Sequence, residues 1–185
     1  MKKAATFAAG FSLCRCLPAA AVWDADYGES MIECALSGDR ERGLLYERLR
    51  MAKIDALDID APYIAYDDLV LLAQVIYTEA GSAWLPVGEV VLNRVASPEF
   101  PDTLAEVVFQ PGQYSAADEG WFEVLIPLRS CLEAALRLLG GERVINDPAV
   151  VFQSGGRQGG GVALEMWDSV YGSTYFCYTN HPELY

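Results

Sequence analysis

The chain has 185 residues, of which 52% are hydrophobic, and a formal net charge of −13. Its length suits one domain with a sizeable core, and so acidic a protein is not expected to bind nucleic acid or anionic membranes through its net field. The only histidine is His181, and the five cysteines form no CxxC pair. This argues against a zinc site and against Ser-His-Asp or Cys-His catalysis, so we expect no metal or other cofactor. Carboxylate chemistry remains.

The N-terminus has the pattern of a secretory signal peptide. Lys2 and Lys3 precede a short apolar run over residues 4–13, and the small residues Ala19-Ala20-Ala21 form a suitable signal-peptidase cleavage site. The apolar run is too short to cross a membrane as a mature helix. We therefore predict a signal peptide over residues 1–21 and a secreted or cell-wall protein without stable membrane insertion.

Export would leave three cysteines, Cys34, Cys131 and Cys177. An exported protein could form a Cys131–Cys177 disulfide, but buried free thiols are an equally good interpretation. The sequence leaves both open.

Residues 22–65 form a more charged lead segment, and residues 40–52 within it are predicted to be an amphipathic helix. Leu45, Leu49 and Ala52 should share its apolar face, with Glu47, Arg48 and Arg50 turned largely outward. A spacer or packing helix is its expected role.

The next helix, over residues 68–80, places one carboxylate in an apolar setting. Asp67 is its predicted N-cap, and its apolar residues recur at helical spacing: Leu69, Leu72, Ala73, Ile76, Tyr77 and Ala80. Glu79 falls beside Leu72 on the flank of this face, away from a polar strip of Gln74 and Thr78. Burial against apolar surface would raise the pKa of Glu79, as a general acid requires. The alternative is a glutamate at a fraying helix end that reaches for water.

The remaining elements follow in order. Residues 87–96, between Pro86 and Pro98, fit a strand or a short helix equally well. Thr103 should cap a short helix that ends at Phe109, and residues 128–139 should form a surface helix that Gly140-Gly141 ends. Residues 149–153 and 174–178 are predicted strands. The glycine-rich loop at 155–161 is expected to be a flexible rim over a groove and not a phosphate cradle.

Four landmarks now stand in order: Tyr77-Thr78-Glu79-Ala80, Val91-Leu92-Asn93-Arg94, Gln113-Tyr114-Ser115 and Tyr175-Phe176-Cys177-Tyr178. In this order the chain resembles, over residues 66–180, the cell-wall hydrolase family of the SleB and CwlJ type, which acts on peptidoglycan, including spore cortex. The resemblance implies a mostly helical α+β domain, related to lysozymes and lytic transglycosylases, with a small antiparallel sheet. We assign this catalytic domain to residues 66–185.

The resemblance also implies roles for individual residues. Glu79 would be the single catalytic glutamate, and Gln113, Tyr114 and Ser115 would position the glycan and polarise its N-acetyl group. Asn93 would brace Glu79 or line the groove. Trp84 could stack on a sugar or fill the core. The segment between Glu79 and the Asn93 helix is shorter than is usual in the family, which bears on substrate affinity.

Peptidoglycan glycan strands are therefore the expected partner, with the oligomeric state left open. The expected reaction is cleavage between N-acetylmuramic acid and N-acetylglucosamine by a lytic transglycosylase with one glutamate as acid and base. A hydrolytic muramidase would need a second carboxylate, for which Asp118, Glu119 and Glu123 are the candidates. A third hypothesis is a non-catalytic wall-binding relative that has lost activity through the shortened loop after Glu79.

Overall fold

The computed structural model describes residues 19–170 and 172–185, with side chains from residue 26 onward. Most of the predicted signal peptide thus lies outside the described residues. The first elements are two antiparallel helices, α1 (Ala19–Ser37) and α2 (Arg40–Leu57). The chain reverses between them at Gly38, whose φ is +72°, a conformation that glycine adopts without strain. Asp39 caps α2 by accepting a hydrogen bond from the Arg42 amide.

Helix α2 packs through a different face from the one predicted. Leu45 and Leu49 are exposed, whereas Arg50 is buried and donates a hydrogen bond to the Pro62 carbonyl at 2.8 Å. The reason is the close approach at Gly43, where an added Cβ would lie 2.2 Å from the Tyr66 ring. The smallest residue of the helix, and not its leucine pair, therefore decides which face meets the rest of the protein.

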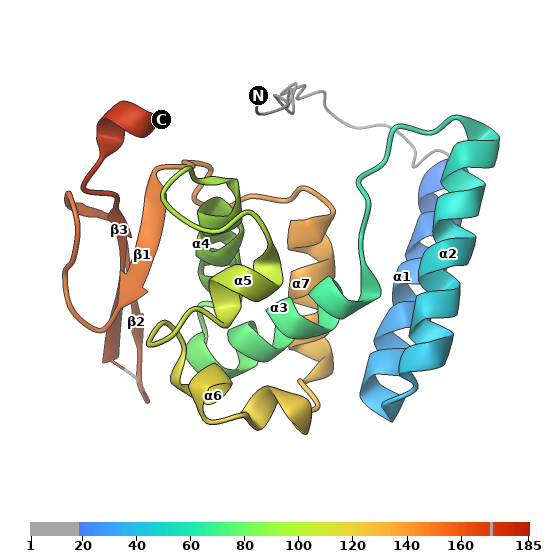
Figure 1. Cartoon of the computed structure of the whole chain (residues 1–185), viewed down its shortest axis with the longest axis horizontal. Coiled ribbons are helices and arrows are strands. Elements are labelled where there is room, and N and C mark those ends of the chain that lie inside the picture. Colours follow the sequence, from blue (N-terminus) through green and yellow to red (C-terminus); the bar gives the residue numbers. More distant parts are fainter. Residues whose placement is uncertain (1–18, 171) are drawn as a thin grey trace.

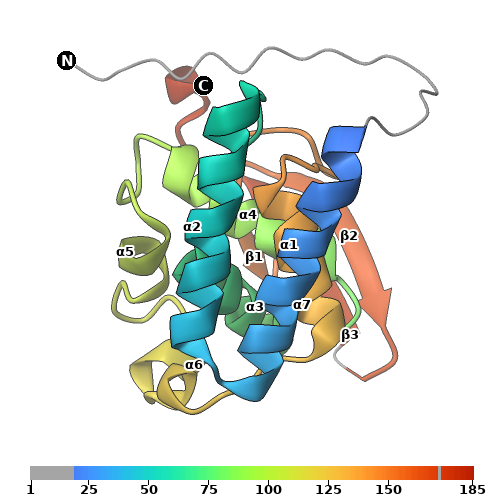
Figure 2. The same ribbon diagram turned by 90° about the vertical axis from the view of Figure 1, so that its right-hand side faces the viewer.

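Within residues 19–170 and 172–185, five further α-helices follow: α3 (Tyr66–Glu79), α4 (Trp84–Ala96), α5 (Leu104–Val108), α6 (Ser115–Asp118) and α7 (Arg129–Leu139). Short 3-10 turns occupy Trp121–Glu123 and Pro182–Leu184. Helix α3 packs against α7, α4 and α5, and the hairpin of α1 and α2 covers α7 and α3 from one side (Figures 1 and 2). The core is continuous across these elements.

Three predictions about these helices can be compared with the structure. Thr103 caps α5 as expected, since its side chain accepts a hydrogen bond from the Glu106 amide. Of the two alternatives for residues 87–96, the helix is the one formed. The N-cap of α3 was misplaced: it is Ala65, and Asp67 lies in the first turn and pairs with Arg40 instead.

The sheet has three antiparallel strands, β1 (Val150–Ser154), β2 (Val162–Asp168) and β3 (Gly172–Tyr178), in the order β1-β3-β2. Strand β1 packs against α4 (Figure 1). The expected mostly helical α+β domain with a small antiparallel sheet is confirmed. Strand β2 was missed, because it is half exposed and follows the glycine-rich loop without a break.

That loop is tied to the sheet. The Gly160 amide donates to the Tyr178 carbonyl at 3.0 Å, and the Tyr178 amide donates to the Gly161 carbonyl at 2.9 Å. An added Cβ at Gly159 would lie 2.0 Å from the Tyr178 carbonyl oxygen. The loop thus extends the sheet edge at its C-terminal end.

Two of the open questions concern cysteines and membranes. Cys34, Cys131 and Cys177 are buried free thiols, so the second alternative for Cys131 and Cys177 is the one found. Within the described residues, no helix combines the length and the apolar character needed to cross a membrane.

Candidate active site

Glu79 is the last residue of α3, and the chain turns away immediately beyond it. The Ala80 amide still bonds to the Ile76 carbonyl, and Gly81 then takes a positive φ of 51°. The Glu79 side chain is exposed to solvent, yet desolvation by the surrounding protein raises its pKa, and the nearby Arg94 partly lowers it. The negative end of the α3 dipole also disfavours an ionised carboxylate at this position. Glu79 is therefore both reachable and biased toward its protonated form.

Arg94, on α4, organises the neighbourhood of Glu79. It is buried and donates from Nε to the Val151 carbonyl at 2.7 Å. Its Nη1 donates to Oε1 of Gln113 at 3.2 Å and to the Tyr114 hydroxyl at 3.0 Å. One guanidinium thus joins α4, β1 and the segment before α6.

The Arg94 guanidinium also lies over two aromatic rings, 5.3 Å from the centroid of Phe100 and 5.6 Å from that of Tyr114. Cation–π contacts at a desolvated site add to the hydrogen bonds that hold it. Arg94 was quoted as part of a landmark but was not predicted as a site residue. The signal for it was a lone cation among the valines of a helix, where a buried charge requires partners.

Tyr114 is buried beside this guanidinium. Desolvation raises the pKa of its phenol, Arg94 lowers it and the negative charge of Glu79 raises it. Arg94 thus acts on the pKa of Glu79 and, together with Glu79, on that of Tyr114, so the three groups lie in one neighbourhood. A neutral phenol whose oxygen accepts from Arg94 keeps its own proton free to donate.

The other predicted residues fall into two groups. Gln113 and Ser115 lie on either side of Tyr114; the Gln113 carbonyl is held by Arg94, and Ser115 is exposed as the first residue of α6. Asn93, in contrast, is buried and donates to the Asp147 and Val150 carbonyls at 3.0 and 2.9 Å. Both donors of the Asn93 amide are thus committed to the backbone, and its predicted role of bracing Glu79 or lining the groove stays a prediction.

Two residues of α3 differ from the predicted pattern. Gln74 is not part of an outward polar strip: it is buried and donates to the carbonyls of Phe122 and Leu125 at 2.9 and 2.8 Å. Tyr77, predicted on the apolar face, is 43% exposed. The segment around Phe122 and Leu125 covers this side of α3 and accepts the hydrogen bonds of the Gln74 amide, while the Tyr77 ring stays exposed.

Trp84 is the first residue of α4 and is 38% exposed. Its indole Nε1 donates to the Gly81 carbonyl at 2.7 Å, so the ring is tied to the short turn that follows Glu79. The alternative in which Trp84 fills the core is therefore wrong. Its ring remains accessible at the surface.

The second-carboxylate candidates lie around α6. Asp118 accepts a hydrogen bond from the Gly112 amide at 3.0 Å, and Glu119 and Glu123 are exposed. The one charge that shifts the pKa of Glu79 appreciably is the cation Arg94. In the part of the chain that the structure describes, no three His, Cys, Asp or Glu side chains gather as a metal-binding group.

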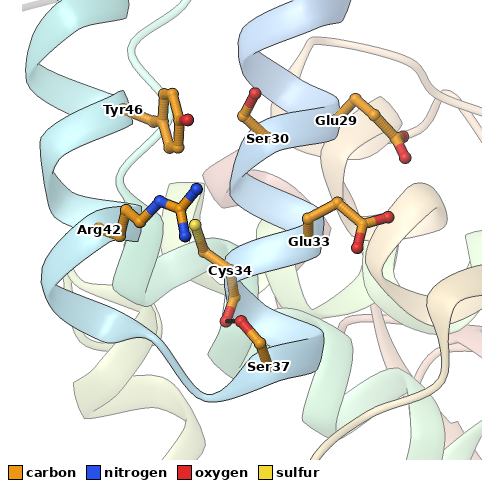
Figure 3. A pocket seen from close by; sticks show the side chains of 7 residues that line it. All are labelled: Glu29, Ser30, Glu33, Cys34, Ser37, Arg42 and Tyr46. Carbon is orange, nitrogen blue, oxygen red and sulfur yellow. Dashed lines mark hydrogen bonds between the residues drawn. The ribbon is translucent and has the colours of Figure 1, made fainter.

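A cavity of about 410 Å³ lies between α1 and α2 and contains a thiol. Figure 3 shows the Cys34 sulfur directed toward Arg42, with Glu29 and Glu33 turned away from it. Burial raises the pKa of the Cys34 thiol, which the Arg42 charge only partly offsets. A protonated thiol is a poor nucleophile, so the setting of Cys34 does not activate it for nucleophilic attack.

The comparisons with known proteins match the part of the chain that holds this site. Residues 78–155 match the family model described as Cell Wall Hydrolase. The chain is similar to the spore cortex-lytic enzyme of Bacillus subtilis, with 34% identity over 48% of this chain and 30% of that protein. It is also similar to the spore cortex-lytic enzyme of Halalkalibacterium halodurans, with 34% identity over 47% of this chain and 27% of that protein.

A third relative, the spore cortex-lytic enzyme of Oceanobacillus iheyensis, is 36% identical over 40% of this chain and 28% of its own length. The chain thus spans less than a third of the length of each of these curated relatives. No solved structure matches the chain significantly. The resemblance to the cell-wall hydrolase family is confirmed for the segment that begins at Thr78 and includes Glu79, Arg94 and Tyr114.

Proposed function

We propose that this chain, which carries a cell-wall hydrolase segment over residues 78–155, cleaves the glycan strand of peptidoglycan between N-acetylmuramic acid and N-acetylglucosamine. The observation that carries the proposal is the state of Glu79. It is accessible to solvent, and desolvation raises its pKa, so the protonated form persists to higher pH than in an ordinary glutamate. A carboxylic acid that can reach substrate and still hold its proton is what a glycosidic leaving oxygen needs.

The first half of the reaction follows from that proton. Glu79 donates it to the glycosidic oxygen as the bond to C1 of the muramic residue breaks, which releases the 4-hydroxyl of N-acetylglucosamine. The ring passes through an oxocarbenium-like transition state. Glu79 is now ionised, and the positive charge of Arg94, which lowers the pKa of Glu79, favours this state.

The second half decides between transglycosylation and hydrolysis. In a lytic transglycosylase the C6 hydroxyl of the same muramic residue attacks C1, and its proton returns to the Glu79 carboxylate. The product is a 1,6-anhydromuramic end, no water is consumed, and a single carboxylate suffices.

Tyr114 and Gln113 have supporting roles in this proposal. Their side-chain oxygens accept from the same Arg94 guanidinium, which fixes the buried Tyr114 behind the site and leaves the amide protons of the exposed Gln113 to contact substrate. An N-acetyl group presents both a carbonyl and an N–H, so donors and acceptors at fixed positions suit it. We expect the protein to act outside the cell, on the wall, as the predicted signal peptide requires.

The test is the analysis of fragments that the purified protein releases from peptidoglycan sacculi and from spore cortex. Glu79→Gln keeps the shape of the side chain and removes the acid, and we expect the rate to fall by about 10²–10⁴-fold. Glu41→Gln, at an exposed glutamate of α2 outside the predicted catalytic domain, is the matched control and should retain activity.

Mass spectrometry of the products then separates the mechanisms. Anhydromuramic ends that vanish in Glu79→Gln support the transglycosylase. Reducing muramic ends would instead show a hydrolytic muramidase and direct attention to Asp118 and Glu123. Binding to sacculi without any turnover, equal in parent and variant, would replace the proposal with a wall-binding protein.

A further inference from the structure

A second cavity, of about 390 Å³, lies between the start of α4, one side of α7 and strand β2. Its wall begins at Ser82, in the turn just after Glu79, and Trp84 and Met166 contribute apolar surface. We name it the Trp84 pocket. Small-molecule sites of this size are usually apolar clefts with a few polar groups at fixed positions, which is how this cavity is built.

Trp84 has a fixed orientation in this pocket. Because its Nε1–H is already donated to the Gly81 carbonyl, the indole has no polar group left to offer and presents only its ring faces. One face of a pyranose ring presents several C–H groups and forms an apolar surface, which can stack on the face of an exposed, immobilised indole. The pocket therefore favours a sugar ring over a flexible peptide.

The charges at the pocket distinguish between sugars. The guanidinium of Arg137 is held by both carboxylate oxygens of Glu142, with an Nε–Oε2 distance of 2.7 Å. Glu133, which also lines the pocket, has Arg129 at 4.0 Å, but Arg129 is bound more closely by Glu29 and Glu33. The Glu133 carboxylate is thus only loosely paired and half exposed, so it can accept hydrogen bonds from hydroxyl or N–H groups and repels a carboxylate placed against it.

We propose that the Trp84 pocket is a subsite for a neutral N-acetylglucosamine unit of the glycan strand, and that it disfavours a unit that carries carboxylates. The inference rests on the proposed function, because the pocket would hold a further sugar of the strand that Glu79 cleaves. It adds a specificity element from α7 and β2, most of which lies outside the sequence landmarks. The stem peptide of a muramic unit carries carboxylates, so the negative Glu133 sets the register in which the strand binds.

The first experiment measures binding of tetra-N-acetylchitotetraose, a neutral N-acetylglucosamine oligomer, to the Glu79→Gln protein by titration calorimetry. Trp84→Ala should weaken this binding at least ~10-fold, and Trp84→Phe, which keeps a ring, should stay within ~3-fold of the parent. Trp167→Ala is the matched control, since Trp167 is 71% exposed on β2 and does not line the pocket. Equal binding by the Trp84→Ala and Trp167→Ala proteins, both folded by circular dichroism, would overturn the proposal.

The second experiment tests the charge. Glu133 lies on the exposed side of α7, so Glu133→Lys can be made without disturbing the core. We expect the ratio of the affinity for a disaccharide-tripeptide muropeptide to the affinity for chitotetraose to rise by ~5-fold or more in this variant. An unchanged ratio would refute the charge argument. If the protein cleaves peptidoglycan but the parent does not bind chitotetraose, the subsite is wrong and the proposed function stands. If chitotetraose binding depends on Trp84 but nothing is cleaved, the subsite stands and the proposed activity is wrong.

Discussion

Replacing Arg94 by methionine tests whether one buried guanidinium both holds the site together and sets the charge that Glu79 feels. Methionine fills most of the space of the arginine stem and removes the charge and all donors. The change leaves the Val151 carbonyl and the Tyr114 hydroxyl without their partner at 2.7 and 3.0 Å. Nothing else in the surrounding side chains is altered.

The expected cost can be worked from these contacts. A buried acceptor that loses its partner costs about 1–3 kcal/mol, and hydrogen bonds from a charged donor lie at the upper end. Since the contacts share one side chain they do not add fully, and we expect the free energy of unfolding to fall by about 3–5 kcal/mol. For a chain of this size that corresponds to a decrease in Tm of roughly 6–20 °C, against a total stability of about 5–15 kcal/mol.

The same substitution should move the pH dependence of activity. Arg94 lowers the pKa of Glu79, so its removal lets desolvation raise that pKa further. A general acid works only while protonated, and its activity falls as pH rises through its pKa. The alkaline limb of the pH–rate profile should therefore shift to higher pH in Arg94→Met.

Arg94→Lys is the matched control, because it keeps the charge and loses the fork of donors. Thermal unfolding should show a loss of stability in both variants, whereas the alkaline limb should move only in Arg94→Met. An unfolding free energy within 1 kcal/mol of the parent in Arg94→Met would refute the structural part of the reasoning. Equal shifts of the alkaline limb in the two variants would refute the electrostatic part.

Two further predictions concern positions away from Glu79. Glu89 is fully buried, and its carboxylate accepts hydrogen bonds from the amides of Val144, Ile145 and Asn146 at 2.6–2.9 Å. Glu89→Gln supplies one acceptor oxygen fewer and should lower the free energy of unfolding, measured in urea, by about 2–3 kcal/mol. A loss below ~1 kcal/mol would contradict this. Gly159→Ala should cost at least ~2 kcal/mol, because φ is +60° and the new Cβ would meet the Tyr178 carbonyl. Gly155→Ala, in the same loop with no atom within 4 Å, should change stability by less than ~0.5 kcal/mol; similar losses at the two glycines would show that the contact is unimportant.

The sequence was informative where local chemistry decides the structure. The periodicity of residues 68–80 predicted the helix that ends at Glu79, and Thr103 marked the start of α5 by capping chemistry alone. The raised pKa of Glu79 was expected from its apolar neighbours and agrees in direction with the structure. In these cases the deciding contacts lie within a turn or two of the residue.

Long-range contacts account for what could not be predicted. The packing face of α2 depends on the ring of Tyr66 against Gly43, and Gln74 is buried because two carbonyls some fifty residues away accept its amide protons. The role of Arg94 likewise depends on β1 and on the loop before α6. Periodicity cannot distinguish a polar side chain that faces water from one that faces a distant carbonyl.

The packing of the α1–α2 hairpin against the rest of the protein determines where the chain can be truncated without loss of structure. Met31 and Ile32 belong to the core, an added Cβ at Gly28 would meet Leu136 at 2.7 Å, and Glu47 accepts the Tyr66 amide that opens α3. A chain trimmed to residues 66–185, the predicted catalytic domain, would lose this layer, and α3, which positions Glu79, would lose part of its cover. The stretch that matches the Cell Wall Hydrolase model, residues 78–155, is thus smaller than the unit that packs together here, and protease-resistant fragments should retain the hairpin.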